Sequence, residues 1–289
     1  MTSASETTLH PFDEAVNLVP SAAGADAKAT DTLRQFEGST HPAYANMVGP
    51  FGGITAAQAM QAVLQHPQRL GEPVSLTVNF AAGLVDGPFR IEARPVRTNR
   101  STQHWTITLW QTAPDNSDMV MLTATAVTAV RRTTWSAADE RMPMVSPPAS
   151  VPAAPFTDRV PWVSRYEMRL VAGALPQRWD DAETDSLTQL WLRDHPPRPL
   201  DYASLTALAD AFFPRIWRRR ARMTPIGTVS MTVYFHADAN ELALIGDGYL
   251  FGQARSQSFF NGFFDQSAQL WSEAGHLLAT THQIVYYKE

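Results

Sequence analysis

A nine-residue segment occurs twice in this chain, once in each half. Residues 74–82 read VSLTVNFAA and residues 229–237 read VSMTVYFHA, with identical residues at six of the nine positions. Valine, threonine and aromatic residues dominate both copies, which is typical of a β-strand. A chain of 289 residues is long enough for two modules of about 140 residues, and each would bury an adequate core. The repeat therefore predicts a duplicated module.

The predicted elements around the two copies follow one order. In the first half, FGGITAAQAMQAVLQHP has apolar residues at helical spacing, which predicts a helix over residues 51–67 that opens with Gly52 and Gly53. In the second half, PLDYASLTALADAFFP predicts the corresponding helix over residues 199–214. The predicted strands lie at 166–173 and 187–194, before the second helix, and at 73–80, 89–96, 103–111, 120–130, 227–236, 242–253, 263–271 and 277–287. Each half thus has one central helix followed by four antiparallel strands.

A proline-rich segment separates the two halves. Proline disfavours both a helix interior and a central strand, and the prolines of this segment are Pro143, Pro147, Pro148, Pro152 and Pro155. We expect an N-terminal module over residues 1–135, an extended linker over 136–160 and a C-terminal module over 161–289. The predicted fold class is α+β, with two fused modules that each wrap a curled antiparallel sheet around a central helix.

Composition excludes several classes of protein. The net charge of −5 argues against a protein that binds nucleic acid. The chain has no cysteine, so disulfides, thiol nucleophiles and cysteine-bound metals are excluded, and a reducing cytoplasm is suited. No secretory signal and no membrane-spanning apolar stretch are evident, which predicts a soluble cytoplasmic protein. The basic run over residues 218–222 is open to two interpretations, a solvated helix end or an anchor for the phosphates of a substrate.

Familiar catalytic motifs are missing as well. The sequence has no G-x-S-x-G nucleophile elbow, no Rossmann or P-loop glycine spacing and no HExxH pair, so we predict neither a metal nor a cofactor. Three polar residues of the second half remain as candidates. Asp210 lies in the predicted helix on an alanine-rich side away from its apolar stripe, Thr228 begins the repeated strand, and Gln283 lies in an otherwise apolar final strand. Taken singly, Asp210 suits a surface position and Thr228 an ordinary strand position, whereas a buried Gln283 would require hydrogen-bond partners.

Four segments together resemble the acyl-CoA thioesterase II, or TesB-like, family. They read GPFGGITAAQAM, LDYASLTALADAFFP, GTVSMTVYFHA and SAQLWSEAGHLLATTHQ, and the resemblance covers residues 40–132 and 165–288. It implies a double hotdog fold, in which two fused hotdog modules form the substrate pocket where they meet. It also implies an acyl-CoA substrate, coenzyme A as the leaving group and no metal.

The resemblance further implies a catalytic set. In this family an aspartate, a threonine and a glutamine hold a water for attack on the acyl thioester, and the matching residues here are Asp210, Thr228 and Gln283. A carboxylate accepts a proton from water, while a hydroxyl and an amide fix the direction of attack. The thioester carbonyl becomes an oxyanion, so we expect backbone amides at the helix start, after Gly52 or Gly53, to bind the substrate there.

Departures from the family pattern leave other functions open. Ser230 and Met231 follow the threonine, and Ile284 follows the glutamine, where the better-characterised branch has acidic residues and a histidine. A non-catalytic acyl-CoA or hydrophobic-ligand binding protein is the main alternative, and a hotdog hydratase is a third. In the first half, Pro73 and Val127 stand at the places that match Thr228 and Gln283, which predicts one site per chain. We also expect a homo-oligomer.

Overall fold

The computed structural model describes residues 9–21, 32–155 and 160–289. Residues 1–8 and 22–31 of the predicted first module and 156–159 of the predicted linker lie outside these ranges. The strands of the first half are β1 (Val19–Pro20), β2 (Arg34–Ser39), β3 (Glu72–Phe80), β4 (Pro88–Thr98), β5 (Thr102–Thr112) and β6 (Asp118–Ala129). Those of the second half are β7 (Tyr166–Ala172), β8 (Thr188–Asp194), β9 (Ile226–Phe235), β10 (Leu250–Arg255), β11 (Phe259–Phe260), β12 (Phe263–Ser272) and β13 (Leu277–Tyr287).

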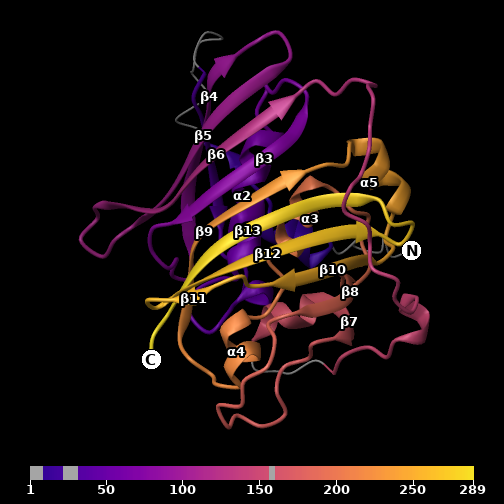
Figure 1. The fold of residues 1–289 in the computed structure, drawn as a ribbon. Coiled ribbons are helices and arrows are strands. Elements are labelled where there is room, and N and C mark those ends of the chain that lie inside the picture. The colour runs from indigo at the N-terminus through magenta and orange to yellow at the C-terminus, as the bar shows by residue number, and fades with distance from the viewer. Residues whose placement is uncertain (1–8, 22–31, 156–159) are drawn as a thin grey trace, which may run out of the picture.

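The helices are fewer and shorter. They are α1 (Pro11–Ala15), α2 (Gly52–Leu64), α3 (Tyr202–Leu208), α4 (Arg215–Arg220) and α5 (Ala239–Ile245), with 3₁₀ turns at η2 (Pro42–Tyr44), η3 (Pro148–Ser150) and η4 (Pro161–Arg165). None of the helices in the described ranges is long and apolar enough to cross a membrane. The strands form one antiparallel sheet in the order β1-β2-β4-β5-β6-β3-β9-β13-β12-β10-β8-β7, with β11 paired to β12 (Figure 1). Outward from β3 the strands are β6, β5, β4, β2 and β1, and outward from β9 they are β13, β12, β10, β8 and β7. Corresponding strands of the two halves therefore follow the same order, as a duplicated module requires.

The repeated segment forms the junction between the two halves. Strands β3 and β9 pair side by side in the middle of the sheet, with Thr77 opposite Thr232 (Figure 1). These threonines occupy the same position of the repeat, so each copy pairs with its own counterpart in the opposite direction. Their hydroxyl oxygens form a hydrogen bond of 3.0 Å. The sequence repeat therefore produces a local two-fold arrangement at the centre of the sheet.

This junction can be measured by a double-mutant cycle. We expect Thr77→Val to lower the free energy of unfolding by about 1 kcal/mol, because it removes the hydrogen bond to Thr232 while it keeps the β-branched shape. Adding Thr232→Val should cost less than it does in the wild type, since its partner is already gone. Chemical denaturation gives the values, and Thr125→Val, on the next strand of the same face, is the matched control. Strictly additive effects would contradict a direct bond.

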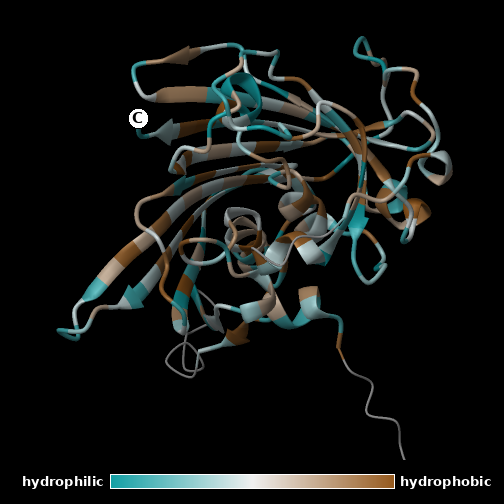
Figure 2. Cartoon of the chain, turned by 90° about the horizontal axis from the view of Figure 1, so that it is seen from below, coloured by the Kyte–Doolittle hydropathy of each residue, from teal (hydrophilic) through white to brown (hydrophobic). Residues whose placement is uncertain are grey.

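The two central helices pack against one another inside the curve of the sheet. Figure 2 shows the strands arching over the helices. Every residue of α3 is buried, which includes both its leucine stripe and its alanine side. A Cβ atom added at Gly53 of α2 would lie 2.7 Å from the carbonyl oxygen of Ala207. The small residues predicted on both helices thus serve close helix–helix approach, and the leucines fill the core.

Two predicted elements of the second half were wrong. The strand predicted at 242–253 is instead α5 followed by β10, because Asp238 and Glu241 form a capping box that starts a helix. Gly246 ends that helix at a φ of 58°, which favours glycine. The second central helix is also shorter than predicted, since α3 ends at Leu208 and Pro214 precedes a separate helix, α4.

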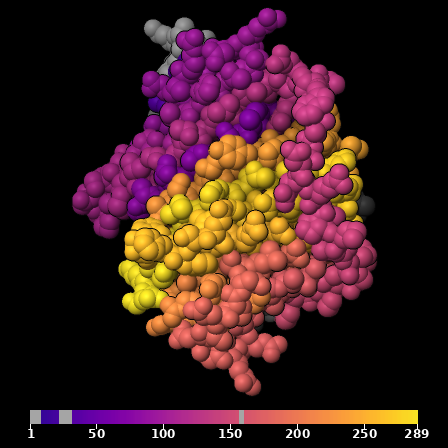
Figure 3. Space-filling view, viewed as in Figure 1, coloured from indigo at the N-terminus to yellow at the C-terminus, as the bar shows by residue number. Residues whose placement is uncertain are grey.

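The described part of the proline-rich segment, residues 136–155, forms no strand and one 3₁₀ turn, η3, and it covers part of the sheet. The indole of Trp191 donates a hydrogen bond of 2.9 Å to the carbonyl oxygen of Ser146, and Arg169 donates one of 2.7 Å to Val151. Val151 and neighbouring apolar residues of the linker pack on Trp191, Phe251 and Trp271. Figure 3 shows the linker, in magenta to pink, lying over strands of the second half. The linker thus buries aromatic side chains outside the main core.

Candidate active site

Asp210 and Gln283 meet inside the protein. Gln283 lies in β13 with its side chain on the inner face of the sheet, and its Nε2 donates a hydrogen bond of 2.7 Å to Oδ1 of Asp210. Only 9% of Asp210 and 3% of Gln283 are exposed. Asp210 was expected within the helix, but it lies in the turn just after α3, where its amide donates to the carbonyl of Ala207. The pair predicted from sequence is therefore in direct contact.

The start of α2 lies against the same carboxyl group. The backbone amide of Gly53 donates a hydrogen bond to Asp210, and a Cβ atom at Gly52 would lie 3.0 Å from Oδ2 of Asp210. The amides of Ile54 and Thr55 donate instead to the carbonyl of Phe51. Within the described ranges the Gly52 amide donates to no acceptor. A helix N-terminus carries positive potential, so this end of α2 suits a carboxylate or an oxyanion.

The surroundings of Asp210 raise the pKa of its carboxyl group toward neutral pH. Burial raises the pKa of Asp210 to about 7, and hydrogen bonds from Gln283 and Gly53 oppose this rise. A carboxyl group with a pKa near the working pH exchanges a proton readily, which is what a general base requires. The site therefore contains a group suited to activate water.

Thr228 lies close to the pair in the sheet but does not bond to it. It pairs with Val285, while Gln283 pairs with Met231, and a bulge in β9 separates the two positions. Val285, the partner of Thr228, lies two residues after Gln283 in β13, so Thr228 and Gln283 share the inner face of the sheet. Thr228 is half-buried. Within the described residues its hydroxyl makes no hydrogen bond to Asp210 or Gln283. The structure joins two of the three predicted residues and places the third on the neighbouring strand.

Sequence reasoning missed Arg215, which is fully buried without a carboxylate partner in the described structure. Its guanidinium donates hydrogen bonds to Oε1 of Gln266, the hydroxyl of Thr188 and the carbonyl of Phe213. Burial and nearby Arg218 lower the pKa of Arg215 to about 9. Because Gln266 lies opposite Gln283 in the sheet, Arg215 ties the segment after Asp210 to the strand beside the site. The only sequence signal for it was an arginine directly after Pro214.

Comparison with known proteins decides the family. A model of the acyl-CoA thioesterase N-terminal domain matches residues 41–129, and a model of the acyl-CoA thioesterase C-terminal domain matches residues 139–287. The chain belongs to the acyl-CoA thioesterase family. The resemblance noted in the sequence is thus confirmed. No curated protein sequence matches the chain.

Solved structures agree with this family. A protein of unknown function with a hot dog fold from Alicyclobacillus acidocaldarius is 47% identical, with 98% of this chain and 99% of that chain covered and a TM-score of 0.86. The tesB protein of Mycobacterium avium subspecies paratuberculosis is 20% identical, with 96% and 98% covered and a TM-score of 0.71. The acyl-CoA thioesterase II TesB2 of Mycobacterium marinum is 17% identical, with 96% and 98% covered and a TM-score of 0.68. The chain therefore has the hotdog fold of this family.

The first half of this family member lacks the same polar set. Met231 lies opposite Gln283, and its repeat counterpart Leu76 lies opposite Ala126. The sequence matched Val127 to Gln283, but the strand pairing makes Ala126 the counterpart of Gln283, so that prediction was wrong by one residue. When β6 and β13 are aligned on the leucine near the start of each strand, their pairing registers differ by one residue. Pro73 does stand at the counterpart of Thr228. Neither counterpart in the first half is a threonine or a glutamine.

The basic run of α4 is matched by carboxylates. Arg218 pairs with Asp185 at 3.4 Å, Arg219 with Glu183 at 2.8 Å and Arg220 with Asp181 at 3.6 Å. These side chains lie at the surface, next to the negative end of a short helix. The solvated interpretation is favoured over an anchor for substrate phosphates, since nearby acidic residues already balance the arginines.

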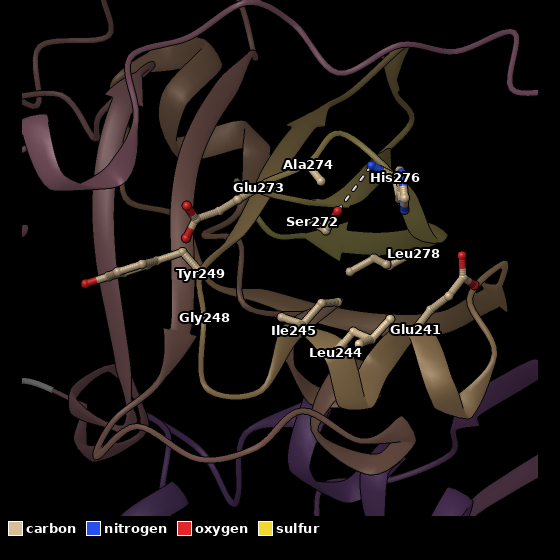
Figure 4. Close-up of a pocket in the computed structure, with 10 residues that line it drawn as sticks. All are labelled: Glu241, Leu244, Ile245, Gly248, Tyr249, Ser272, Glu273, Ala274, His276 and Leu278. Carbon is tan, nitrogen blue, oxygen red and sulfur yellow. Dashed lines mark hydrogen bonds between the residues drawn. The ribbon is translucent and has the colours of Figure 1, made fainter.

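A surface hollow of about 400 Å³ lies elsewhere on this thioesterase-family chain. It is bordered by α5, by the residues before β10 and by the turn between β12 and β13, and Glu241, Tyr249, Glu273 and His276 line it (Figure 4). Leu278 borders the hollow near the start of β13, and Gln283 lies roughly 17 Å further along that strand. The hollow is thus separate from Asp210. Among the described residues, no group of three or more His, Cys, Asp or Glu side chains could hold a metal ion.

Proposed function

We propose that this chain is an acyl-CoA thioesterase that hydrolyses an acyl-CoA thioester to a free acid and coenzyme A. The observation that carries the proposal is the buried contact of Asp210 with Gln283 at the start of α2, with a pKa of about 7 for the aspartate. Membership of the acyl-CoA thioesterase family supplies the substrate class.

The proposed reaction uses a single water and no covalent enzyme intermediate. Asp210 accepts a proton from water while the oxygen of that water bonds to the thioester carbon. The amide of Gly52 faces the oxyanion, while the amide of Gly53 and the side chain of Gln283 hold the carboxylate in place. Collapse of the tetrahedral intermediate breaks the carbon–sulfur bond, and Asp210 returns its proton to the leaving thiolate. Thr228 fixes the water from the neighbouring strand.

We further propose a double hotdog with modules at 1–135 and 161–289, joined by the linker over 136–160. The mirrored strand order and the pairing of Thr77 with Thr232 support two copies of one module. In this arrangement the second module supplies Asp210, Thr228 and Gln283, and the first supplies Gly52 and Gly53. One site per chain follows, with acyl-CoA as its partner. A cytoplasmic location is part of the proposal, because the cysteine-free sequence suits a reducing compartment.

A homo-oligomer is proposed from the outer face of the sheet. Val229, Tyr234, Ile284 and Tyr286 are exposed on β9 and β13, at the middle of the sheet. Apolar side chains gathered on adjacent strands favour association with another surface.

The test of function is the release of free thiol from a panel of acyl-CoAs. We expect the wild type to release thiol, and Asp210→Ala and Gln283→Ala to lose most of the activity. If the wild type turns over and both variants retain full activity, the site assignment is wrong. If acyl-CoA raises the melting temperature of the wild type without any turnover, the chain is a binding protein instead.

The pH profile provides a finer prediction. We expect kcat to rise with pH through about 7, because Asp210 acts as a base only after it loses its proton. The hydrogen bond from Gln283 lowers the pKa of Asp210, so Gln283→Ala should move this rise to higher pH. Gln253→Ala is the control, because Gln253 accepts its hydrogen bond from Gln189, away from Asp210. If the pH profile of Gln283→Ala is not shifted, Gln283 does not tune the pKa of the catalytic base.

A further inference from the structure

A single buried arginine contacts the segment that carries Asp210. Arg215, the first residue of α4, is 0% exposed. Its Nε donates a hydrogen bond of 3.0 Å to the carbonyl oxygen of Phe213, which lies between Asp210 and α4, and the guanidinium carbon lies 4.6 Å from the centre of the Phe213 ring. Its Nη1 donates to the hydroxyl of Thr188 at 2.8 Å and to the carbonyl oxygen of Ser186 at 3.2 Å. Acceptors from separate segments therefore hold the guanidinium in one place.

Arg215 also bonds to a glutamine that neighbours Gln283. Its Nε donates a second hydrogen bond of 3.0 Å to Oε1 of Gln266, on β12. Gln266 lies directly opposite Gln283 of β13, so both buried side chains project from the same inner face, with Cβ atoms about 5 Å apart. Gln283 in turn donates its hydrogen bond of 2.7 Å to Asp210. One side chain therefore stands between Arg215 and the proposed catalytic contact.

The chemistry of arginine fixes the direction in which the Gln266 amide points. A guanidinium has donors and no acceptor, so Gln266 turns its Oε1 toward Arg215 and its Nε2 away. If that amide reversed, its Oε1 would face Gln283 and would compete with Asp210 for the N–H groups of Gln283. Arg215 thus keeps a competing acceptor away from Gln283.

We propose that Arg215 is a positioning residue for the reaction at Asp210: by holding Oε1 of Gln266, it leaves the N–H groups of Gln283 to the aspartate. This inference rests on the proposed thioesterase activity and adds a residue to it. Arg215 acts through its neighbours and exchanges no proton. Because the planar fork of arginine bonds to several acceptors at once, it suits this role better than a lysine ammonium.

The pH dependence of kcat reports this positioning. The hydrogen bond from Gln283 lowers the pKa of Asp210, so its loss should move the rise of kcat to higher pH. The variants below leave in place the other groups that act on the aspartate or the arginine, which are the Gly53 amide of α2, Tyr166 of β7 and Arg218 of α4.

The first experiment compares pH profiles of kcat. Arg215→Met should shift the rise of kcat upward by about one pH unit with KM unchanged, because Gln266 is released to compete for Gln283. Adding Gln266→Met should bring the profile back toward that of the wild type, since methionine presents no amide oxygen. An unshifted profile in Arg215→Met would overturn the proposal. A double variant as strongly shifted as Arg215→Met would also overturn it, because the lost charge alone would then explain the shift.

Arg131→Met is the matched control. Arg131 likewise donates to backbone carbonyl oxygens, those of Pro73 and Phe235 at 2.9 Å each, but at the far end of the paired strands β3 and β9. We expect this variant to lose stability without a shift in the pH profile. An equal shift in the control would reveal a general effect of lost stability and would contradict a positioning role.

A second variant covers the case in which Arg215→Met does not fold, and its test needs no turnover. Gln266→Glu keeps an acceptor for Arg215 but places a second carboxylate oxygen beside Gln283. In its crystal structure we expect Nε2 of Gln283 to bond to the new carboxylate and to lie more than about 3.5 Å from Asp210. An unchanged contact of 2.7 Å would overturn the proposal. If the wild type releases no thiol from acyl-CoA, the proposed function is wrong, and this structure still decides whether position 266 controls the contact.

Discussion

We expect Asp210→Asn to lower kcat for the proposed acyl-CoA hydrolysis by about 10²–10⁴-fold, the range expected when a general base is lost. Asparagine has nearly the same shape and can still accept the hydrogen bond from Gln283, but it cannot take a proton from water. We expect KM to change little, because the carboxyl group is buried at the start of α2 and acts on the attacking water rather than binding the substrate. The measurement is thiol release under saturating acyl-CoA, with Asp118→Asn at the surface as the control.

The same substitution should make the protein more stable at high pH. The folded-state pKa of Asp210 is raised above its value of 3.8 in the unfolded chain, so folding favours the protonated form. Its contribution to stability is therefore complete below about pH 4 and is lost as pH rises through about 7. At pH 8 we expect the free energy of unfolding of Asp210→Asn to exceed that of the wild type by on the order of 2–4 kcal/mol. Near pH 4 the two values should agree. An inactive variant that is also less stable at pH 8 would indicate a structural role for Asp210.

Much of the fold could be predicted because the sequence repeats itself. The segments at Thr77 and Thr232 predicted two copies, and the structure pairs them at the centre of the sheet. The strand predicted at 242–253 failed because an apolar run does not distinguish a strand from a short helix, and the Asp238–Glu241 capping box decides it. The register of Ala126 could not be found from sequence, since matching leucines does not reveal which residues face each other across strands.

The candidate site was predictable only in part. Asp210 and Gln283 came from the resemblance to a family, because 73 residues separate them in the chain and no spacing rule connects them. The contact of Asp210 with the start of α2 depends on how two helices pack, which no local pattern specifies. Arg215 escaped notice for the same reason, since it becomes informative only when its neighbours in space are known.

Gly53→Ala should cost more stability than any other single methyl group added near the site. The new Cβ atom would lie 2.7 Å from the carbonyl oxygen of Ala207 and 2.5 Å from the ring of Phe51. The ring is buried and stacks on Trp162 with centroids 4.2 Å apart, and the carbonyl belongs to the backbone of α3, so neither neighbour yields readily. We expect a loss of about 3 kcal/mol in the free energy of unfolding, at the upper end for an overpacked core. Urea denaturation followed by circular dichroism gives this value.

The effect of Gly53→Ala on activity should come from the same displacement. Since the Gly53 amide donates to Asp210, moving α2 away from α3 weakens that bond and raises the pKa of the carboxyl group further. We therefore expect the rise of kcat with pH to shift upward in the folded fraction of this variant. Gly83→Ala is the control, because its nearest neighbour would be 3.9 Å away. Adding Phe51→Leu should restore only part of the stability lost in Gly53→Ala, because the backbone carbonyl of Ala207 still blocks the new atom after the ring is removed. Full recovery in that double variant would show that the ring, and not the approach of the two helices, sets the requirement for glycine.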